Sequence, residues 1–314
     1  MTLIAPTARH TLFGILAAIG GAAVFSINDV AIKSLSGRYP LHEVILARST
    51  ISLIFLLAFM AATGNGLRQI RTGRPRAHLL RVGFVMLSNI TYFLGLAALP
   101  LADAVAIGFV APLVVTLMSV VVLGETVGPR RWAAVAVGLA GVVVMMRPGQ
   151  GALQPAAVLV FISAFTYAAT HMMTRRMRET ESAATLNFYV QLGFIAVSTT
   201  MGLVVGDGHL AGSPDASLAF LLRGWLWPPL ADVPWFLASG MAVAIGGLMI
   251  SQAYRMCNAA VVAPFEYAGM PLAILWGVAF FGQWPDTMAW IGIALICGAG
   301  LYTLWRETVV RRRA

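Results

Sequence analysis

Apolar runs of about 20 residues recur along the whole chain, separated by short polar segments. An α-helix rises 1.5 Å per residue, so a run of that length crosses the hydrocarbon core of a bilayer, which is about 30 Å thick. Only 11% of the 314 residues are charged, whereas a soluble domain needs roughly 25% to cover its surface. The runs are also too long and too evenly apolar for membrane strands. We therefore expect an all-α integral membrane protein.

Ten membrane spans account for these runs, with short connections and no room for a soluble domain. The one long connection is 207–232, where Trp225 and Trp227 are candidate anchors at the membrane interface. The spans are expected at Thr11–Ile32, Leu41–Thr63, Leu79–Leu99, Ala102–Leu123, Trp132–Met146, Pro155–Thr174, Ala183–Gly206, Val233–Tyr254, Ala259–Phe281 and Thr287–Trp305.

The positive charges give this layout an orientation. With the N-terminus inside, the inner segments hold 16 Lys and Arg residues and the outer segments hold 4, while Arg48 falls within a span. Cytoplasmic loops are enriched in Lys and Arg, so both termini of this multi-pass protein are expected in the cytoplasm. The net charge of +9 is then explained by topology. The protein is expected to lie in the lipid bilayer and to have no nucleic-acid partner.

The segment Leu96–Met146 has a faint copy 158 positions later, in which Gly124 falls on Gly282 and Trp132 on Trp290. The chain therefore divides into two related halves, 1–150 and 151–314, with five spans each. Because five is odd, the second half enters the membrane from the opposite side. Inverted repeats of this kind form substrate sites between the halves near the middle of the bilayer, which favours transport as the function.

Three stretches resemble one known family. LGETVGPRRWAAVAVGLAGVVVM (Leu123–Met145) and FGQWPDTMAWIGIALICGAGLYTL (Phe281–Leu304) resemble the ends of the two repeat units of EamA-type transporters in the drug/metabolite transporter superfamily. FSINDVAIKSLSGRYPLHEVILARS (Phe25–Ser49) resembles the first hairpin of that family, with Arg48 at the position of its usual arginine. One departure is that the acidic residue of the turn is Glu125 in the first unit but Gln283 in the second.

The resemblance implies a secondary transporter of the bacterial inner (plasma) membrane that moves a small organic metabolite by alternating access. Export of an amino acid or a related compound is the first interpretation. Uptake of a compound like S-adenosylmethionine or riboflavin is the alternative, and APFEYAGMPLAILWGVAFFGQ in the ninth span is similar to that branch.

Polar side chains at membrane depth are costly, so they are the candidate site residues. The predicted substrate-binding residues are Asn89, Tyr92, Tyr167, His171 and Tyr267. The predicted gate or coupling residues are Asp29, Arg48, Gln252 and Glu266. Depth along the spans puts Asn89, Tyr92 and Tyr167 near the middle, His171, Gln252 and Glu266 in the inner third, and Asp29 and Arg48 in the outer third.

Purely structural explanations compete with these functional roles. Asp29 and Arg48 would also suit an ion pair that only locks two spans together. The polar stripe of the sixth span, Ser163, Thr166, Tyr167, Thr170, His171 and Thr174, would also serve helix packing. Glycines in the fifth and tenth spans indicate packing seams or the face of a homodimer: Gly138, Gly141, Gly292, Gly298 and Gly300. Prolines are expected to kink spans four and nine, at Pro112, Pro264 and Pro271.

Two other classes of function compete with transport. A membrane-embedded enzyme would carry a zinc motif, a pair of catalytic aspartates, or a serine with a histidine or lysine at depth, and the sequence has none of them. We therefore expect no enzyme activity, no metal and no cofactor. A channel would favour a repeated ring of pore-lining groups, whereas the polar residues here are spread unevenly. Cys257 and Cys297 lie in apolar context and are expected to pack as free thiols.

Overall fold

The structure is a computed structural model that describes residues 8–63, 66–111, 113–115, 117–118, 129–146, 155–257 and 262–311. Within these ranges all regular structure is helical. Six helices are long and apolar enough to cross a membrane: α1 (Ala8–Ser36), α2 (Leu41–Ala62), α3 (Pro75–Ala98), α7 (Pro155–Met177), α8 (Ala183–Val205) and α10 (Val233–Met256). The all-α prediction is confirmed.

Four shorter apolar helical segments supply the remaining spans: Leu101–Val115, Trp132–Met145, Phe265–Phe281 and Thr287–Tyr302. They belong to α4 (Leu101–Gly108), α6 (Pro129–Met146), η2 (Ala263–Ala268) with α12 (Gly269–Phe281), and α13 (Thr287–Arg311). Together with the six long helices they give ten apolar segments in the predicted order. Two short helices lie in the connections, η1 (Gly66–Ile70) and α9 (Ala216–Leu222).

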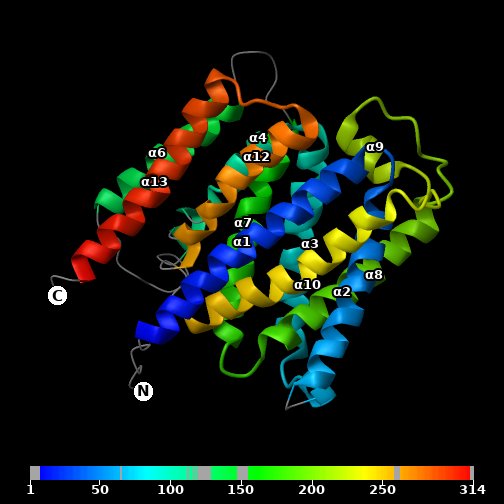
Figure 1. The fold of residues 1–314 in the computed structure, drawn as a ribbon, viewed down its shortest axis with the longest axis horizontal. Helices are drawn as coiled ribbons and strands as arrows, with labels where there is room; N and C mark the ends of the chain where they lie inside the picture. The colour runs from blue at the N-terminus through cyan, green and yellow to red at the C-terminus, as the bar shows by residue number, and fades with distance from the viewer. Residues whose placement is uncertain are drawn as a thin grey trace.

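The helices pair across the two halves of the chain. α1 packs on α10, α3 on α7, α2 on α8, α6 on α13 and α4 on α12 (Figure 1). If each helix is exchanged for the one five spans away, this set of pairs maps onto itself. Such a pattern is what two related halves with a twofold relation would give. The predicted boundary between the halves, at residues 150 and 151, lies outside the described residues.

Spans four and nine are both interrupted. α4 ends at Gly108 and a turn at Phe109 and Val110 precedes further helical residues, while span nine contains the 3₁₀ segment η2 before α12. The two breaks meet, because the Tyr267 hydroxyl of η2 donates a hydrogen bond of 3.0 Å to the Phe109 carbonyl. A break frees backbone carbonyls that lipid cannot satisfy, so this bond supports the break in span four. Pro112, which was expected to kink that span, lies outside the described residues.

The glycine-rich spans form an internal seam. Figure 1 shows α6 and α13 side by side at one edge of the bundle. A Cβ added at Gly141 would lie 2.8 Å from Leu295 and 3.0 Å from the Gly292 carbonyl, and one at Gly138 would meet Leu113. Small residues let these helices approach closely. Gly298 instead has open space around it.

The connection between α8 and α10 closes one end of the bundle. Phe220 of α9 is fully buried, and the Ser217 hydroxyl donates to the Leu94 carbonyl of α3 at 2.7 Å. At the start of α10, Asp232 accepts hydrogen bonds from the Tyr39 hydroxyl at 2.6 Å and from the Arg38 guanidinium at 2.7 Å. These two bonds, the one from Tyr39 being the larger cause, hold the pKa of Asp232 below its usual 3.8.

Candidate functional site

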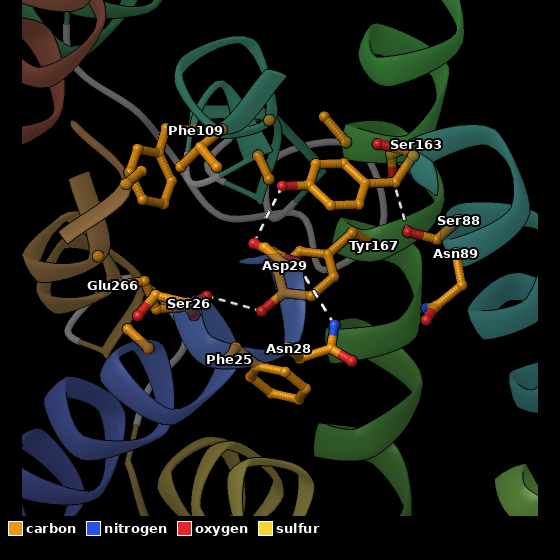
Figure 2. Close-up of a pocket in the computed structure, with 18 of the residues that line it drawn as sticks. Phe25, Ser26, Asn28, Asp29, Ser88, Asn89, Phe109, Ser163, Tyr167 and Glu266 are labelled. Atoms are coloured by element: carbon orange, nitrogen blue, oxygen red, sulfur yellow. Dashed lines mark hydrogen bonds between the residues drawn. The ribbon is translucent and has the colours of Figure 1, made fainter. Parts of the chain in front are cut away.

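A cavity of about 210 Å³ lies inside the bundle, beside the two interrupted spans. α1, α3 and α4 line it from the first half, and α7, α10, η2 and α12 line it from the second. Its polar lining consists of Ser26, Asn28, Asp29, Ser88, Asn89, Tyr92, Ser163, Tyr167 and Glu266. Figure 2 shows Asp29 and Tyr167 near its centre, with Glu266 on one side and Asn89 on the other. Both halves therefore contribute polar groups to one chamber.

Glu266 is held by two tyrosines. Its Oε2 accepts from the Tyr167 hydroxyl at 2.6 Å, and its Oε1 accepts from the Tyr254 hydroxyl at 2.5 Å. The Glu266 residue is 8% exposed and Tyr254 is 1% exposed. Tyr167 lines the cavity, whereas Tyr254 does not. Glu266 Oε2 is therefore bonded to a residue of the cavity wall, and Oε1 is bonded to a residue outside that wall.

Asp29 is held by neighbours on α1 and α3. The Tyr92 hydroxyl donates to Asp29 Oδ2 at 3.1 Å, and the Asn28 amide donates to Oδ1 at 3.4 Å. Asn28 Oδ1 in turn accepts from Ser239 of α10 at 2.8 Å and from Arg48 of α2 at 3.3 Å. The Arg48 charge thus reaches Asp29 through an amide and not by direct contact.

Arg48 is 1% exposed and lies behind the cavity wall. It also donates to Asn89 Oδ1 at 3.1 Å, and its guanidinium lies 4.8 Å from the ring centre of Phe93 and 5.2 Å from that of Phe194. A planar guanidinium can bridge two amides and stack on rings at once, which an ammonium group does less well. Arg48 therefore fixes the two amides that border the cavity.

Five of the nine predicted site residues line the cavity: Asp29, Asn89, Tyr92, Tyr167 and Glu266. The other four, Arg48, His171, Gln252 and Tyr267, lie outside its lining. His171 is stacked on Tyr254 with ring centres 3.8 Å apart. Gln252 accepts from Arg255 at 2.9 Å, and Tyr267 bonds the break in span four.

The polar stripe of α7 divides into two parts. Its serine and threonines donate to carbonyls of their own helix one turn back, as with Thr170 to Thr166 at 3.0 Å and Thr174 to Thr170 at 2.9 Å. This is the packing explanation for those residues. Tyr167 instead reaches Glu266 on η2.

Sequence reasoning did not single out Phe25, Ser26 and Phe109, which also line the wall. Phenylalanine and serine are ordinary in membrane helices, so their types carry no signal. Phe109 has a position that could have been found, because it follows Gly108 in a span where a proline-induced break was expected.

The first half of the chain matches a family model: residues 12–147 match the EamA-like transporter family. The chain is 29% identical to a riboflavin transporter of Rhizobium johnstonii, over 98% of this chain and 95% of the relative. It is 25% identical to an S-adenosylmethionine uptake transporter of Rickettsia prowazekii, over 90% and 89%. It is 27% identical to a pseudopaline exporter of Pseudomonas aeruginosa, over 90% and 93%.

A solved crystal structure shares the fold. It superposes with a TM-score of 0.69 and 20% sequence identity, and the match covers 98% of both chains. The helical arrangement is therefore one that an experimental structure also has.

Proposed function

From the EamA-like transporter domain that this chain carries over residues 12–147, we propose a secondary carrier that moves a small organic metabolite across the bacterial inner membrane by alternating access. The observation that carries the proposal is the cavity between the halves, bordered by an interrupted span from each. Carriers built from inverted repeats bind substrate at such broken helices near the midplane. The termini are proposed to be cytoplasmic, on the distribution of Lys and Arg.

The proposed substrate is a metabolite with a flat ring, of the kind that the riboflavin and S-adenosylmethionine relatives are named for. Aromatic rings border the cavity from α1, α3 and α7 and from Phe109 just after α4, and nine polar residues of the described ranges complete its mostly apolar wall. Ligand sites in proteins commonly combine an apolar wall with a few oriented polar groups. Asp29, Asn89, Tyr92, Tyr167 and Glu266 are proposed to contact the substrate, and Arg48, His171, Gln252 and Tyr267 to support them.

Uptake is the proposed direction, and export of an amino-acid-like compound is the second candidate. The second candidate is supported by the relative named as a pseudopaline exporter. The two candidates differ in which side of the membrane gives the substrate access.

Solute flux in proteoliposomes tests the proposal. The full chain is reconstituted in one orientation, and uptake and release of labelled riboflavin, S-adenosylmethionine and a set of amino acids are measured. Saturable flux of a ring-bearing solute, absent from empty liposomes, is expected. Flux of amino acids alone would favour the second candidate. No saturable flux of any of these solutes would overturn carrier function.

Asn89→Ala supplies the site control, because Asn89 borders the cavity and its amide is oriented by Arg48. We expect its KM to rise. Thr200→Ala, at an exposed position on α8 away from the cavity, should leave KM unchanged. Equal KM values for the two variants would remove the cavity from the proposal.

A further inference from the structure

The cavity contains an imbalance of charge. Two carboxyl groups line it, Asp29 from α1 and Glu266 from η2, and no lysine, arginine or histidine is among the described residues of its lining. Arg48 approaches the cavity from behind its wall, through the amides of Asn28 and Asn89. Two acids therefore face the chamber with one cation behind them.

Two further cations of the described spans, Lys33 and Arg81, are engaged elsewhere. Lys33 donates to the carbonyls of Leu96 and Leu99 at 3.0 and 2.6 Å. Arg81 donates to the Thr174 hydroxyl at 2.9 Å and to the Leu186 carbonyl at 3.0 Å. These side chains satisfy backbone and hydroxyl groups at the ends of the spans, so neither of them compensates Glu266.

The two acids also differ in their environment. Asp29 is linked to Arg48 through Asn28, whereas the partners of Glu266 are the neutral hydroxyls of Tyr167 and Tyr254. Removing a carboxylate from water costs free energy unless a positive charge comes close to it. A ligand with a positive charge would supply what the protein does not.

The shape of the wall indicates where the rest of that ligand lies. Phe25 of α1 and Phe109 at the break of α4 border the cavity near the acids (Figure 2). The ring of Tyr167 lies beside Asp29, and its hydroxyl points toward Glu266. Aromatic faces attract cations and stack on flat rings.

Building on the proposed carrier function, we propose that the cavity selects organic monocations: a sulfonium or quaternary nitrogen joined to a flat heteroaromatic ring. The positive centre lies between Asp29 and Glu266, and the ring packs against Phe25 and Phe109. The charge, and not the ring, decides which solute binds.

Two matched pairs of probes test the charge at nearly constant shape. S-adenosylmethionine and S-adenosylhomocysteine differ by the methyl group that makes the sulfur a sulfonium, and 1-methylnicotinamide and nicotinamide differ by the methyl group that makes the ring cationic. Binding to the purified full chain in nanodiscs is measured by calorimetry and by thermal shift. In at least one pair, the charged member is expected to bind about tenfold more tightly or better, a difference of about 1.4 kcal/mol. Affinities within about threefold in both pairs, or undetectable binding of all four probes, would overturn the proposal.

Two variants assign the effect to the acids. Glu266→Gln and Asp29→Asn keep the size of the side chain, and each is expected to weaken the charged probe about tenfold or more while changing the neutral probe less than threefold. Glu43→Gln is the matched control, since Glu43 is a 7% exposed acid of α2 outside the cavity that accepts from the Leu226 amide at 3.1 Å. It should not change the preference for charge. If Glu43→Gln abolishes that preference and the cavity variants keep it, the cavity is not the site.

The flux assay separates failure of this proposal from failure of carrier function. Riboflavin is uncharged at neutral pH, so saturable riboflavin flux without preference for either cation would retain the carrier and refute selection by charge. Absence of flux for every solute, with the charged probes still binding more tightly than their neutral mates, would retain the cation site and refute the carrier. The two conclusions therefore rest on different measurements.

Discussion

Replacing Tyr254 with phenylalanine removes one hydroxyl and keeps the ring that stacks on His171 at 3.8 Å. The lost group donates to Glu266 Oε1, and both residues are buried, Tyr254 at 1% and Glu266 at 8% exposure. A buried hydrogen bond to a charged group contributes about 1.5–3 kcal/mol, against about 0.5–1.5 kcal/mol for a neutral pair. We therefore expect Tyr254→Phe to lower the free energy of unfolding by about 2 kcal/mol.

The matched variant is Tyr167→Phe, which removes the bond to the other oxygen of the same carboxylate. The Tyr167 hydroxyl lies at the cavity wall, so a water molecule can take its place as hydrogen-bond donor to Glu266 at small cost. Its expected cost is about 1 kcal/mol or less. The two variants lose the same atom from the same residue type, so the difference between them reports on burial.

A double-mutant cycle with Glu266→Gln isolates the charge. In that background the partner of Tyr254 is a neutral amide, so the cost of Tyr254→Phe should fall to about 1 kcal/mol, a coupling of about 1 kcal/mol. Unfolding of the full chain is followed in mixed micelles by titration with a denaturing detergent. An equal cost of Tyr254→Phe in both backgrounds, or a larger cost for Tyr167→Phe than for Tyr254→Phe, would refute the reasoning.

Three further changes have expected outcomes, the first two in the same unfolding assay and the third in thermal unfolding at two pH values. Gly95→Val should cost about 1–3 kcal/mol by overpacking, because even a Cβ at Gly95 would lie 2.6 Å from a carbonyl oxygen of α7; an unchanged stability would contradict the close contact of α3 and α7. Arg48→Lys should cost about 2 kcal/mol, because an ammonium cannot keep both amide bonds and both ring contacts; a cost below about 0.5 kcal/mol would contradict the bridging role. The pKa of Asp232 is lowered on folding, so its bonds to Tyr39 and Arg38 stabilise the fold above about pH 3.8 and are lost as pH falls below that value. Asp232→Asn should therefore lower the thermal midpoint at pH 7 and have no effect at the acid end, and an effect of the same size at both ends would be the contrary result.

The sequence predicts the spans well because each span is a local property. A run of apolar residues bounded by polar turns determines where a membrane helix begins and ends. The predicted starts at Leu41, Pro155, Ala183, Val233 and Thr287 coincide with the first residues of α2, α7, α8, α10 and α13. Polar residues at depth also identify much of the candidate site, since burying them in lipid is costly wherever the helix packs.

The grouping of those polar residues could not be predicted in the same way. Depth computed at 1.5 Å per residue assigned Asp29 to an outer cluster with Arg48, and Glu266 to an inner cluster with His171. The structure brings Asp29 and Glu266 to one cavity. The calculation assumed continuous, upright α-helices, whereas span nine contains a 3₁₀ segment with a longer rise per residue. Which helices face each other depends on packing across the halves, which sequence spacing does not contain.

The structure shows what Gln283 does at the position where the family usually has an acidic residue. Its Oε1 accepts from the Leu101 backbone N–H at 3.2 Å, so it satisfies a free donor at the start of α4. An amide oxygen serves this purpose as a carboxylate oxygen does, without placing a charge there. Glu125, the corresponding residue of the first half, lies outside the described residues. Gln283 therefore makes a contact between the two halves of the chain.

The two ends of the bundle are closed by polar contacts at corresponding places. At one end Asp232, just before α10, bonds Tyr39 in the turn between α1 and α2. At the other, Glu181 in the turn between α7 and α8 accepts from Thr72, just before α3, at 2.6 Å, and lies 3.2 Å from His78. Exchanging the halves places the α1–α2 turn on the α7–α8 turn and the start of α10 on the start of α3. The two sets of contacts, here called clasps, are therefore equivalent in position. The acid lies before α10 in the first clasp and in the α7–α8 turn in the second. If the proposed alternating access operates, opening to one side would require release of one clasp while the other is kept. The two clasps differ in chemistry, with an arginine and a tyrosine bonding the acid at one end and a histidine and a threonine at the other.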